Sequence, residues 1–170
     1  VISGGSIGGL LRYRQDVLMP AINDLGRTAM VVGEAINTQL GQGLDANGQF
    51  GAALFNDINS VFAIGQRSVG GSNNSAGSGN LNVTIKDTSK LSTFDYKVTF
   101  SDDKNYTVLR SDGKSMGTFD ITQTPPEIDG FTLALDGKGP VAAGDTFKVS
   151  PTAGGAMDLK VVMTDPNKLA

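Results

Sequence analysis

The sequence contains no histidine, no cysteine and no tryptophan. Without histidine or cysteine, the chain cannot form a Ser-His-Asp triad, a cysteine nucleophile or the common structural zinc sites. We therefore expect a protein that is not an enzyme and that needs no metal or other cofactor.

A strong charge of one sign and a long hydrophobic run are also missing. The 14 basic and 17 acidic residues give a net charge of −3, and neither half of the chain forms a basic patch for nucleic acid or anionic lipid. No apolar run approaches the roughly 20 residues that cross a bilayer. The chain starts at Val1 in the middle of a pattern, so we expect it to be part of a longer protein.

Residues 8–40 carry the hydrophobic pattern of a long helix. Apolar residues recur at steps of seven, four and three, which places them on one face of an α-helix. This face consists of Leu11, Leu18, Ile22, Leu25, Ala29, Val32, Ile36 and Leu40. A helix of roughly 30 residues is about 45 Å long, too long for a domain of this size to cover. We expect the face to pack against other helices, and the sequence contains no second good one.

Two residue types, proline and glycine, interrupt or end this helix. Pro20 lacks a backbone donor and predicts a kink or a locally broken turn. Gly26 and Gly33 lie seven residues apart and favour the close approach of a neighbouring helix. Gly41 and Gly43 then predict the end of the helix.

The segment after the helix begins like a calcium-binding loop at Asp45. The sixth and twelfth positions of that loop, which require glycine and glutamate, are Phe50 and Asn56. We therefore predict a β-turn built on Asn47 and Gly48. Residues 54–64 are compatible with either a strand or a short helix.

From Leu81 onward, apolar residues alternate with polar ones, as they do in strands with one face buried. About seven short antiparallel strands are expected, separated by Asp-Gly and similar turns. They are centred on residues 81–85, 94–100, 106–108, 119–121, 131–135, 147–149 and 157–163. Tyr96 and Tyr106 are expected in the core or in cross-strand pairs.

These patterns predict an α+β fold in which a long N-terminal helix precedes an antiparallel β-sandwich or barrel-like domain. We expect a helical rod segment with a glycine-rich start and the LDANG turn at 1–66, and a Gly/Ser/Asn-rich linker at 67–80. The β domain follows at 81–165, and 166–170 begin the return to the helical domain.

Several pieces of the sequence resemble the flagellar hook-associated proteins that form the hook–filament junction. They are GGSIGGLLRYRQ, LGRTA at 25–29, NTQ at 37–39 and GLDANGQFGAALF at 43–55. The turn of this motif contains Gly43, Asp45, Asn47, Gly48 and Gly51.

This resemblance implies a structural component of the bacterial flagellum, secreted through the flagellar export apparatus and assembled outside the cell. Its implied partners are other copies of itself in a ring, the hook protein and the second junction protein. An export chaperone would act through a region outside this sequence. The isolated chain is expected to be a weakly associating monomer.

Two other function classes stay open. The first is an extracellular, adhesin-like β-sheet binding module on a helical stalk, which an exposed apolar patch on the sheet would favour. The second is a glycoside hydrolase, which needs two carboxyl groups facing each other across a groove. Its candidate acids are Asp95, Asp102, Asp103, Asp120, Glu127, Asp129 and Asp145. Because most of these acids fall in turns, solvated turn residues are the favoured interpretation.

Overall fold

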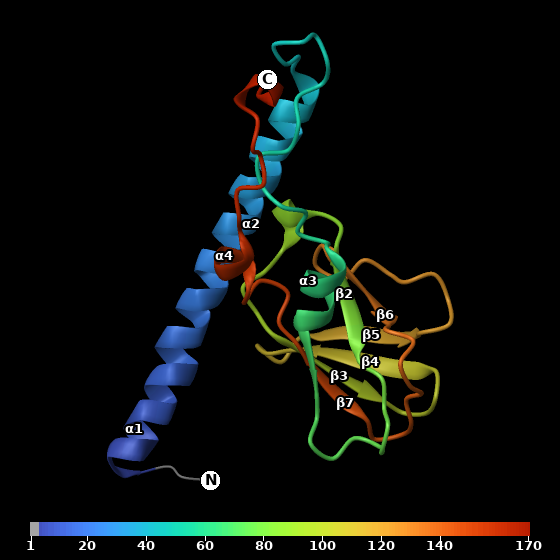
Figure 1. The fold of residues 1–170 in the computed structure, drawn as a ribbon. Helices are drawn as coiled ribbons and strands as arrows, with labels where there is room; N and C mark the ends of the chain where they lie inside the picture. The colour runs from blue at the N-terminus through green and yellow to red at the C-terminus, as the bar shows by residue number, and fades with distance from the viewer. Residues whose placement is uncertain (1–3) are drawn as a thin grey trace.

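A computed structural model of the chain describes residues 4–170. A long helical rod carries a β module on one side (Figure 1). The first three residues of the predicted helical segment lie outside the described part of the chain. The predicted α+β class, with the long helix before the antiparallel strands, is confirmed.

The rod consists of three consecutive helical parts. They are α1 (Gly5–Tyr13), the π-helical turn η1 (Arg14–Leu18) and α2 (Met19–Gln42), which together span about 57 Å at 1.5 Å per residue. The local break predicted at Pro20 is present as this π-turn, directly before the proline. Pro20 has no N–H for the carbonyl of residue 16 and crowds it, and a wider turn is a common way for a helix to accommodate such a defect. None of the described helices is long and apolar enough to span a membrane.

The β module is a sandwich of two antiparallel sheets. The larger sheet has the order β1-β7-β3-β4-β5, and the smaller one pairs β2 with β6. The strands are β1 (Ser68–Gly70), β2 (Leu81–Ile85), β3 (Tyr96–Phe100), β4 (Asn105–Arg110), β5 (Ser115–Asp120), β6 (Phe131–Leu135) and β7 (Thr146–Val149). The short helix α3 (Val61–Gln66) leads into β1, and the 3-10 turn η2 (Thr88–Lys90) follows β2.

The core lies between the two sheets. Alternate residues of β2, β3, β4 and β7 point inward, and β2 shows a strict buried and half-buried alternation. Tyr96 of one sheet meets Phe131 of the other in an edge-on contact with ring centroids 4.9 Å apart. Tyr106 is also buried, as expected, and packs between Phe100 and Phe119.

The prediction of a strand at residues 157–163 is wrong. Gly155–Asp158 form a short helix, α4, and the residues after it run beside residues 54–56 instead of joining the sheet. Asn56 N donates to Lys160 O at 3.0 Å, and Val162 N donates to Leu54 O at 2.9 Å. The apolar alternation of this segment therefore belongs to an extended chain that lies along the rod.

The predicted linker 67–80 contains a strand. β1 pairs with β7, with Ser68 opposite Val149, although its sequence Ser-Val-Gly is too short to show alternation. The division of the chain into domains stays a prediction.

The final segment includes the 3-10 turn η3 (Pro166–Lys168). It runs along residues 43–56, because Ala52 N donates to Lys168 O at 3.0 Å. The return to the rod thus begins at α4, before residue 166.

The glycine-rich stretch after β1 is attached to the sheet by a buried carboxylate. Asp145 is 2% exposed. Its oxygens accept hydrogen bonds from Ser75 N at 2.7 Å, Ser75 Oγ at 2.8 Å and Ala142 N at 2.9 Å. Burial raises the pKa of Asp145, but the hydrogen bonds from Ser75 and Ala142 outweigh it and hold the pKa below its ordinary value of 3.8.

We expect Asp145→Asn to lower the free energy of unfolding by about 1–3 kcal/mol at neutral pH, because an amide cannot accept all three of these bonds. Urea unfolding measures the effect, and Asp103→Asn, in an exposed turn, is the control. The folded-state pKa is lowered, so the stabilisation is present above the unfolded pKa of about 3.9 and disappears as the pH falls through the lower folded value. A difference between wild type and variant that persists unchanged well below pH 4 would contradict this assignment.

Candidate assembly surface

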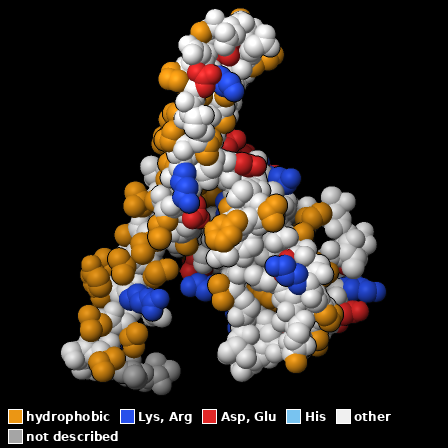
Figure 2. Space-filling model, viewed as in Figure 1, with side chains coloured by type: hydrophobic (Ala, Val, Ile, Leu, Met, Phe, Trp, Pro, Cys, Tyr) orange, Lys and Arg blue, Asp and Glu red, His pale blue; other side chains and the backbone are white. Residues whose placement is uncertain are grey.

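Much of the apolar face that the sequence predicts on the rod is left uncovered by the described residues. Leu11 and Leu18 are each 42% exposed, Leu25 is 62% exposed and Val32 is 47% exposed. The other four members are half-buried, namely Ile22, Ala29, Ile36 and Leu40. Hydrophobic side chains follow the rod in the space-filling view (Figure 2). Contiguous exposed apolar surface of this kind is typical of a protein contact, and its part in helix packing or assembly stays a prediction.

The rod contacts the rest of the chain through a different face. The buried residues of α2 are Asn23, Gly26, Met30 and Gly33, roughly a quarter turn around the axis from the apolar face at 3.6 residues per turn. A Cβ on Gly26 would lie 1.7 Å from Thr152 O, and one on Gly33 would lie 2.8 Å from Leu159 Cδ1. The close approach predicted at these glycines is confirmed, although the neighbour is the loop around α4 and not a second long helix.

Two polar side chains of this part of the rod bind the β module. Asn23 Nδ2 donates to Thr93 O at 2.9 Å and to Asp95 Oδ1 at 3.3 Å. Arg27 Nε donates to Leu91 O at 2.7 Å. The contact between rod and module therefore combines close backbone packing with hydrogen bonds to loop carbonyls.

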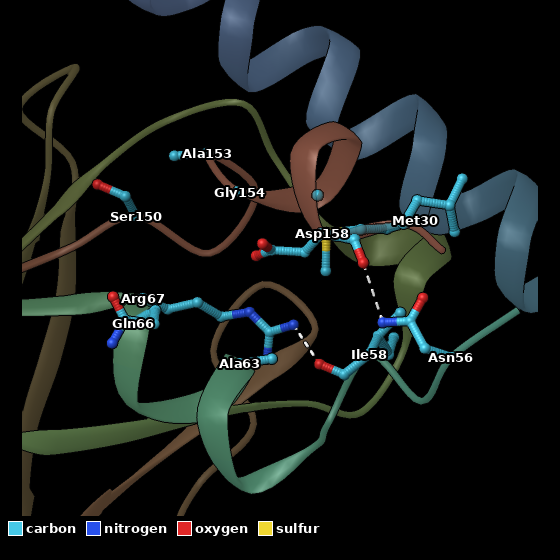
Figure 3. A pocket seen from close by; sticks show the side chains of 12 residues that line it. Met30, Asn56, Ile58, Ala63, Gln66, Arg67, Ser150, Ala153, Gly154 and Asp158 are labelled. Carbon is cyan, nitrogen blue, oxygen red and sulfur yellow. Dashed lines mark hydrogen bonds between the residues drawn. The ribbon is translucent and has the colours of Figure 1, made fainter. Parts of the chain in front are cut away.

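A small cavity lies where the rod, α3 and α4 meet (Figure 3). Arg67, at the end of α3, reaches across it. Its guanidinium donates to Val83 O at 2.9 Å, to Asn59 Oδ1 at 3.4 Å and to Ile58 O. Burial lowers the pKa of Arg67 to about 10, while the negative charges of Asp158 and Asp57 oppose this shift. Arg67 thus stays protonated at neutral pH and connects the end of α3 with the loop at residues 58–59 and with strand β2.

The motif turn closes the far end of the rod. Gly48 N donates to Asp45 O at 3.0 Å, and Asp45 Oδ1 accepts from Asn47 N and Gln49 N. Gly48 has a φ of +74°, which glycine adopts without strain. A β-turn is therefore present, but its central residues are Ala46 and Asn47, one position before the predicted pair Asn47 and Gly48.

Of the two outer glycines of the motif, Gly51 lies against the end of the rod and Gly43 lies against Ala170. A Cβ on Gly51 would lie 2.3 Å from Leu40 O, and one on Gly43 would lie 2.8 Å from Ala170 Cβ. The motif residues therefore have a local structural role. Their part in contacts with another protein stays a prediction.

Most of the candidate acids of a hydrolase are held in hydrogen bonds or ion pairs with their neighbours. Asp102 and Asp120 accept hydrogen bonds from residues in their own turns, and Asp145 is bonded to Ser75. Asp95 pairs with Lys148 at 3.2 Å, Glu127 with Lys90 at 2.8 Å and Asp129 with Arg110 at 3.1 Å. Asp103 is exposed. No group of three or more acids that could hold a metal ion occurs in residues 4–170.

Sequence reasoning missed two features of this surface. The face of α2 against the module contains Asn23, Gly26 and Gly33, which are not hydrophobic, so the apolar periodicity could not reveal it. Val61 and Phe62 on α3 are 89% and 70% exposed, and they were hidden in a stretch without a clear period. The signal for the first feature was the pair of glycines seven residues apart.

Two family models match the sequence. One, described as the flagellar hook-associated protein FlgK helical domain, matches residues 1–55. The other, described as the flagellar hook-associated protein 1 D2-like domain, matches residues 69–151.

Full-length relatives and a solved structure agree with these matches. The chain is 33% identical over 175 residues to flagellar hook-associated protein 1 of Escherichia coli (strain K12) and 30% identical over 174 residues to that of Salmonella typhimurium (strain LT2). Each alignment covers 100% of this chain and 29% of the relative, so the chain spans less than a third of the length of these curated proteins. The structure of the flagellar hook junction protein FlgK from Burkholderia pseudomallei matches with a TM-score of 0.77 and 31% identity, over 98% of this chain and 29% of that one. These proteins are named for the flagellar hook and its junction, and not for an enzymatic activity.

Proposed function

Because the chain belongs to the FlgK family of flagellar hook-associated proteins, we propose that it is a structural subunit of the bacterial flagellum that joins hook to filament. It acts by assembling with copies of itself into a ring. The protein works outside the cell, after secretion through the flagellar export apparatus.

The observation that supports this proposal best is the uncovered apolar face of the rod. Leu18, Leu25 and Val32 lie on one side of a helix, and each exposes at least 42% of its surface. Leaving such side chains in water costs about 25 cal/mol for each Å² of apolar surface, so a partner that covers them gains stability. A row of this length suits another helix, packed side by side as in helix bundles.

Further partners follow from the position of a junction between hook and filament. We propose that one end of the ring contacts the hook protein and the other contacts the second junction protein. An export chaperone would bind a part of the protein beyond these 170 residues. The face of the rod that each partner covers is open to experiment.

Complementation of a deletion strain tests the proposal. Deleting the gene that encodes this chain is expected to leave hooks without attached filaments and to abolish swimming, and the intact gene is expected to restore both. The double variant Leu18→Asp with Leu25→Asp should fail to restore swimming, because two carboxylates on the apolar face oppose the burial of that face.

Thr38→Asp is the matched control, since Thr38 is exposed on a different side of the same helix. Circular dichroism and the thermal midpoint should show that both variant chains are folded. Normal swimming with the double variant would rule out the apolar face as an assembly surface, and normal swimming in the deletion strain would rule out the function itself.

An extracellular binding module is a second candidate, favoured by an open, apolar-lined groove on the outward face of the larger sheet. A glycan or matrix-protein ligand of this groove would raise the thermal midpoint, and the shift would grow with the logarithm of the ligand concentration above its Kd. A screen with no such shift would remove this candidate.

A further inference from the structure

Two large hydrophobic side chains project from the β module at the start of α3. Val61 is 89% exposed and Phe62 is 70% exposed. Ser60 caps this helix by accepting a hydrogen bond from Ala63 N at 3.3 Å, and Ala63 is buried against the module. With Ala63 fixed inward, the two preceding side chains point outward. We refer to Val61 and Phe62 as the α3 knob.

An apolar groove crosses the outward face of the larger sheet. Strand register aligns Val69, Lys148, Lys97 and Leu109 in one row across β1, β7, β3 and β4, and all four line the groove. Val69 is 65% exposed and Leu109 is 45% exposed. The aliphatic stems of the two lysines lie between them, and such stems cover apolar surface well. We refer to these four residues as the sheet groove.

The knob and the groove lie on the two outer faces of the sandwich. Val69 alternates with the inward-facing Ser68, which places the groove on the side of the larger sheet away from the core. The surface beside the knob includes Asn82, which alternates with the buried Leu81 and Val83 of the smaller sheet. One copy of the chain therefore cannot place its own knob in its own groove.

The charges around the two features are complementary. The acids on the side of the knob are Asp136, which lies in the same hollow as Lys138, and Asp57, which precedes α3 and lies in a hollow with Lys86. Lys97 and Lys148 lie in the groove. Lys148 pairs with Asp95 at 3.2 Å, whereas no acidic side chain within the described residues forms an ion pair with Lys97. A carboxylate from a second molecule would complete this site.

We propose that the α3 knob of one copy of this chain docks into the sheet groove of the next copy. The contact joins two different surfaces, so it is head-to-tail and produces a ring or a filament instead of a closed two-fold dimer. This inference rests on the proposed function, because it gives the subunits of that assembly a contact between their β modules. Two side chains in a groove bury far less than the roughly 1,200–2,000 Å² of a stable interface. The contact should therefore be weak in solution, with a Kd in about the millimolar range, and should become strong only in a closed assembly.

Disulfide trapping tests this contact cleanly, since the chain contains no cysteine of its own. Mixing the Phe62→Cys chain with the Leu109→Cys chain under mild oxidation should give a mixed dimer roughly tenfold faster than the control pair. The control pairs Phe62→Cys with Met157→Cys, because Met157 is 83% exposed and lies on α4. A chain with both Phe62→Cys and Leu109→Cys should form a ladder of oligomers that extends beyond the dimer.

Several outcomes would overturn the proposal. They are a mixed-dimer rate equal to the control, faster linking of Phe62→Cys to itself, or a doubly substituted chain that stops at the dimer. A second pair, Val61→Cys with Val69→Cys, repeats the test at neighbouring positions in case one variant does not fold. Adding Lys97→Glu to the chain that carries the groove cysteine should slow trapping in both pairs. Failure here with normal complementation by the intact gene would reject this contact and leave the junction function in place, whereas a deletion strain that swims would reject the function.

Discussion

Replacing Gly26 by alanine is expected to lower the free energy of unfolding by about 3 kcal/mol, at the upper end of the range for overpacking. The added Cβ would lie 1.7 Å from Thr152 O and 2.9 Å from Thr152 C. Both atoms belong to backbone, so no side-chain rotation can relieve the contact. The loop before α4 must move away from the rod, and the burial of Met30 is lost with it.

Gly9→Ala is the matched control for this prediction. Gly9 also lies inside a helix, but a Cβ there meets no atom within 4 Å. Because alanine favours helix over glycine by about 1 kcal/mol, this variant should be unchanged or slightly more stable. Urea unfolding compares the two variants, and limited proteolysis around residues 150–156 reports whether the loop has left the rod. Equal stability of both variants would show that the rod and the β module do not depend on this contact.

Replacing Arg67 by methionine should lower the free energy of unfolding by about 2–4 kcal/mol. Methionine fills a similar volume but leaves the carbonyls of Ile58 and Val83 without their donor, and each buried unsatisfied group costs about 1–3 kcal/mol. Arg67→Lys should recover only part of the loss, because a single ammonium group cannot reproduce the fork of a guanidinium. The midpoint of thermal unfolding is measured for the wild type, Arg67→Met and Arg67→Lys to compare their stabilities.

Arg14→Met, at an exposed position on the rod, controls for the general loss of a positive charge. If Arg67→Met were as stable as this control, water would have to satisfy the carbonyls of Ile58 and Val83 in the cavity. The hydrogen bonds of Arg67 would then not be needed to hold these segments together.

The parts of the fold that sequence reasoning predicted are those in which apolar residues follow a simple period. The strands at 81–85 and 131–135 were found within their true bounds, because every second residue faces the core. The apolar face of the rod was likewise visible, since Leu18, Leu25 and Val32 repeat at seven residues. These patterns depend only on which side chains are apolar, and the sequence records that directly.

Other parts depend on contacts that leave no periodic signal. β1 has only three residues and lies in a glycine-rich stretch, so its pairing with β7 could not be inferred. Residues 157–163 alternate as a strand does, yet they lie along the rod, because Gly26 and Gly155 let α4 approach it closely. For the candidate surface, the apolar rod face was predicted, whereas the α3 knob was not, since an exposed Phe62 looks the same in sequence as a buried one.

The pairing of β1 with β7 at the base of the β module also fixes how the module is connected to the rod. The module leaves and rejoins the remainder of the chain at adjacent points, because Ser68 lies opposite Val149 and Ser150 N donates to Arg67 O at 2.8 Å. Residues 68–149 therefore form one closed excursion from the remainder of the chain. Changing the length of this excursion would change the entropy cost of closing it only slightly. A change in the length of the module therefore leaves its two connections to the rod at the same place, whereas the bonds from Asn23 and Arg27 to residues 91–95 depend on the sequence inside it.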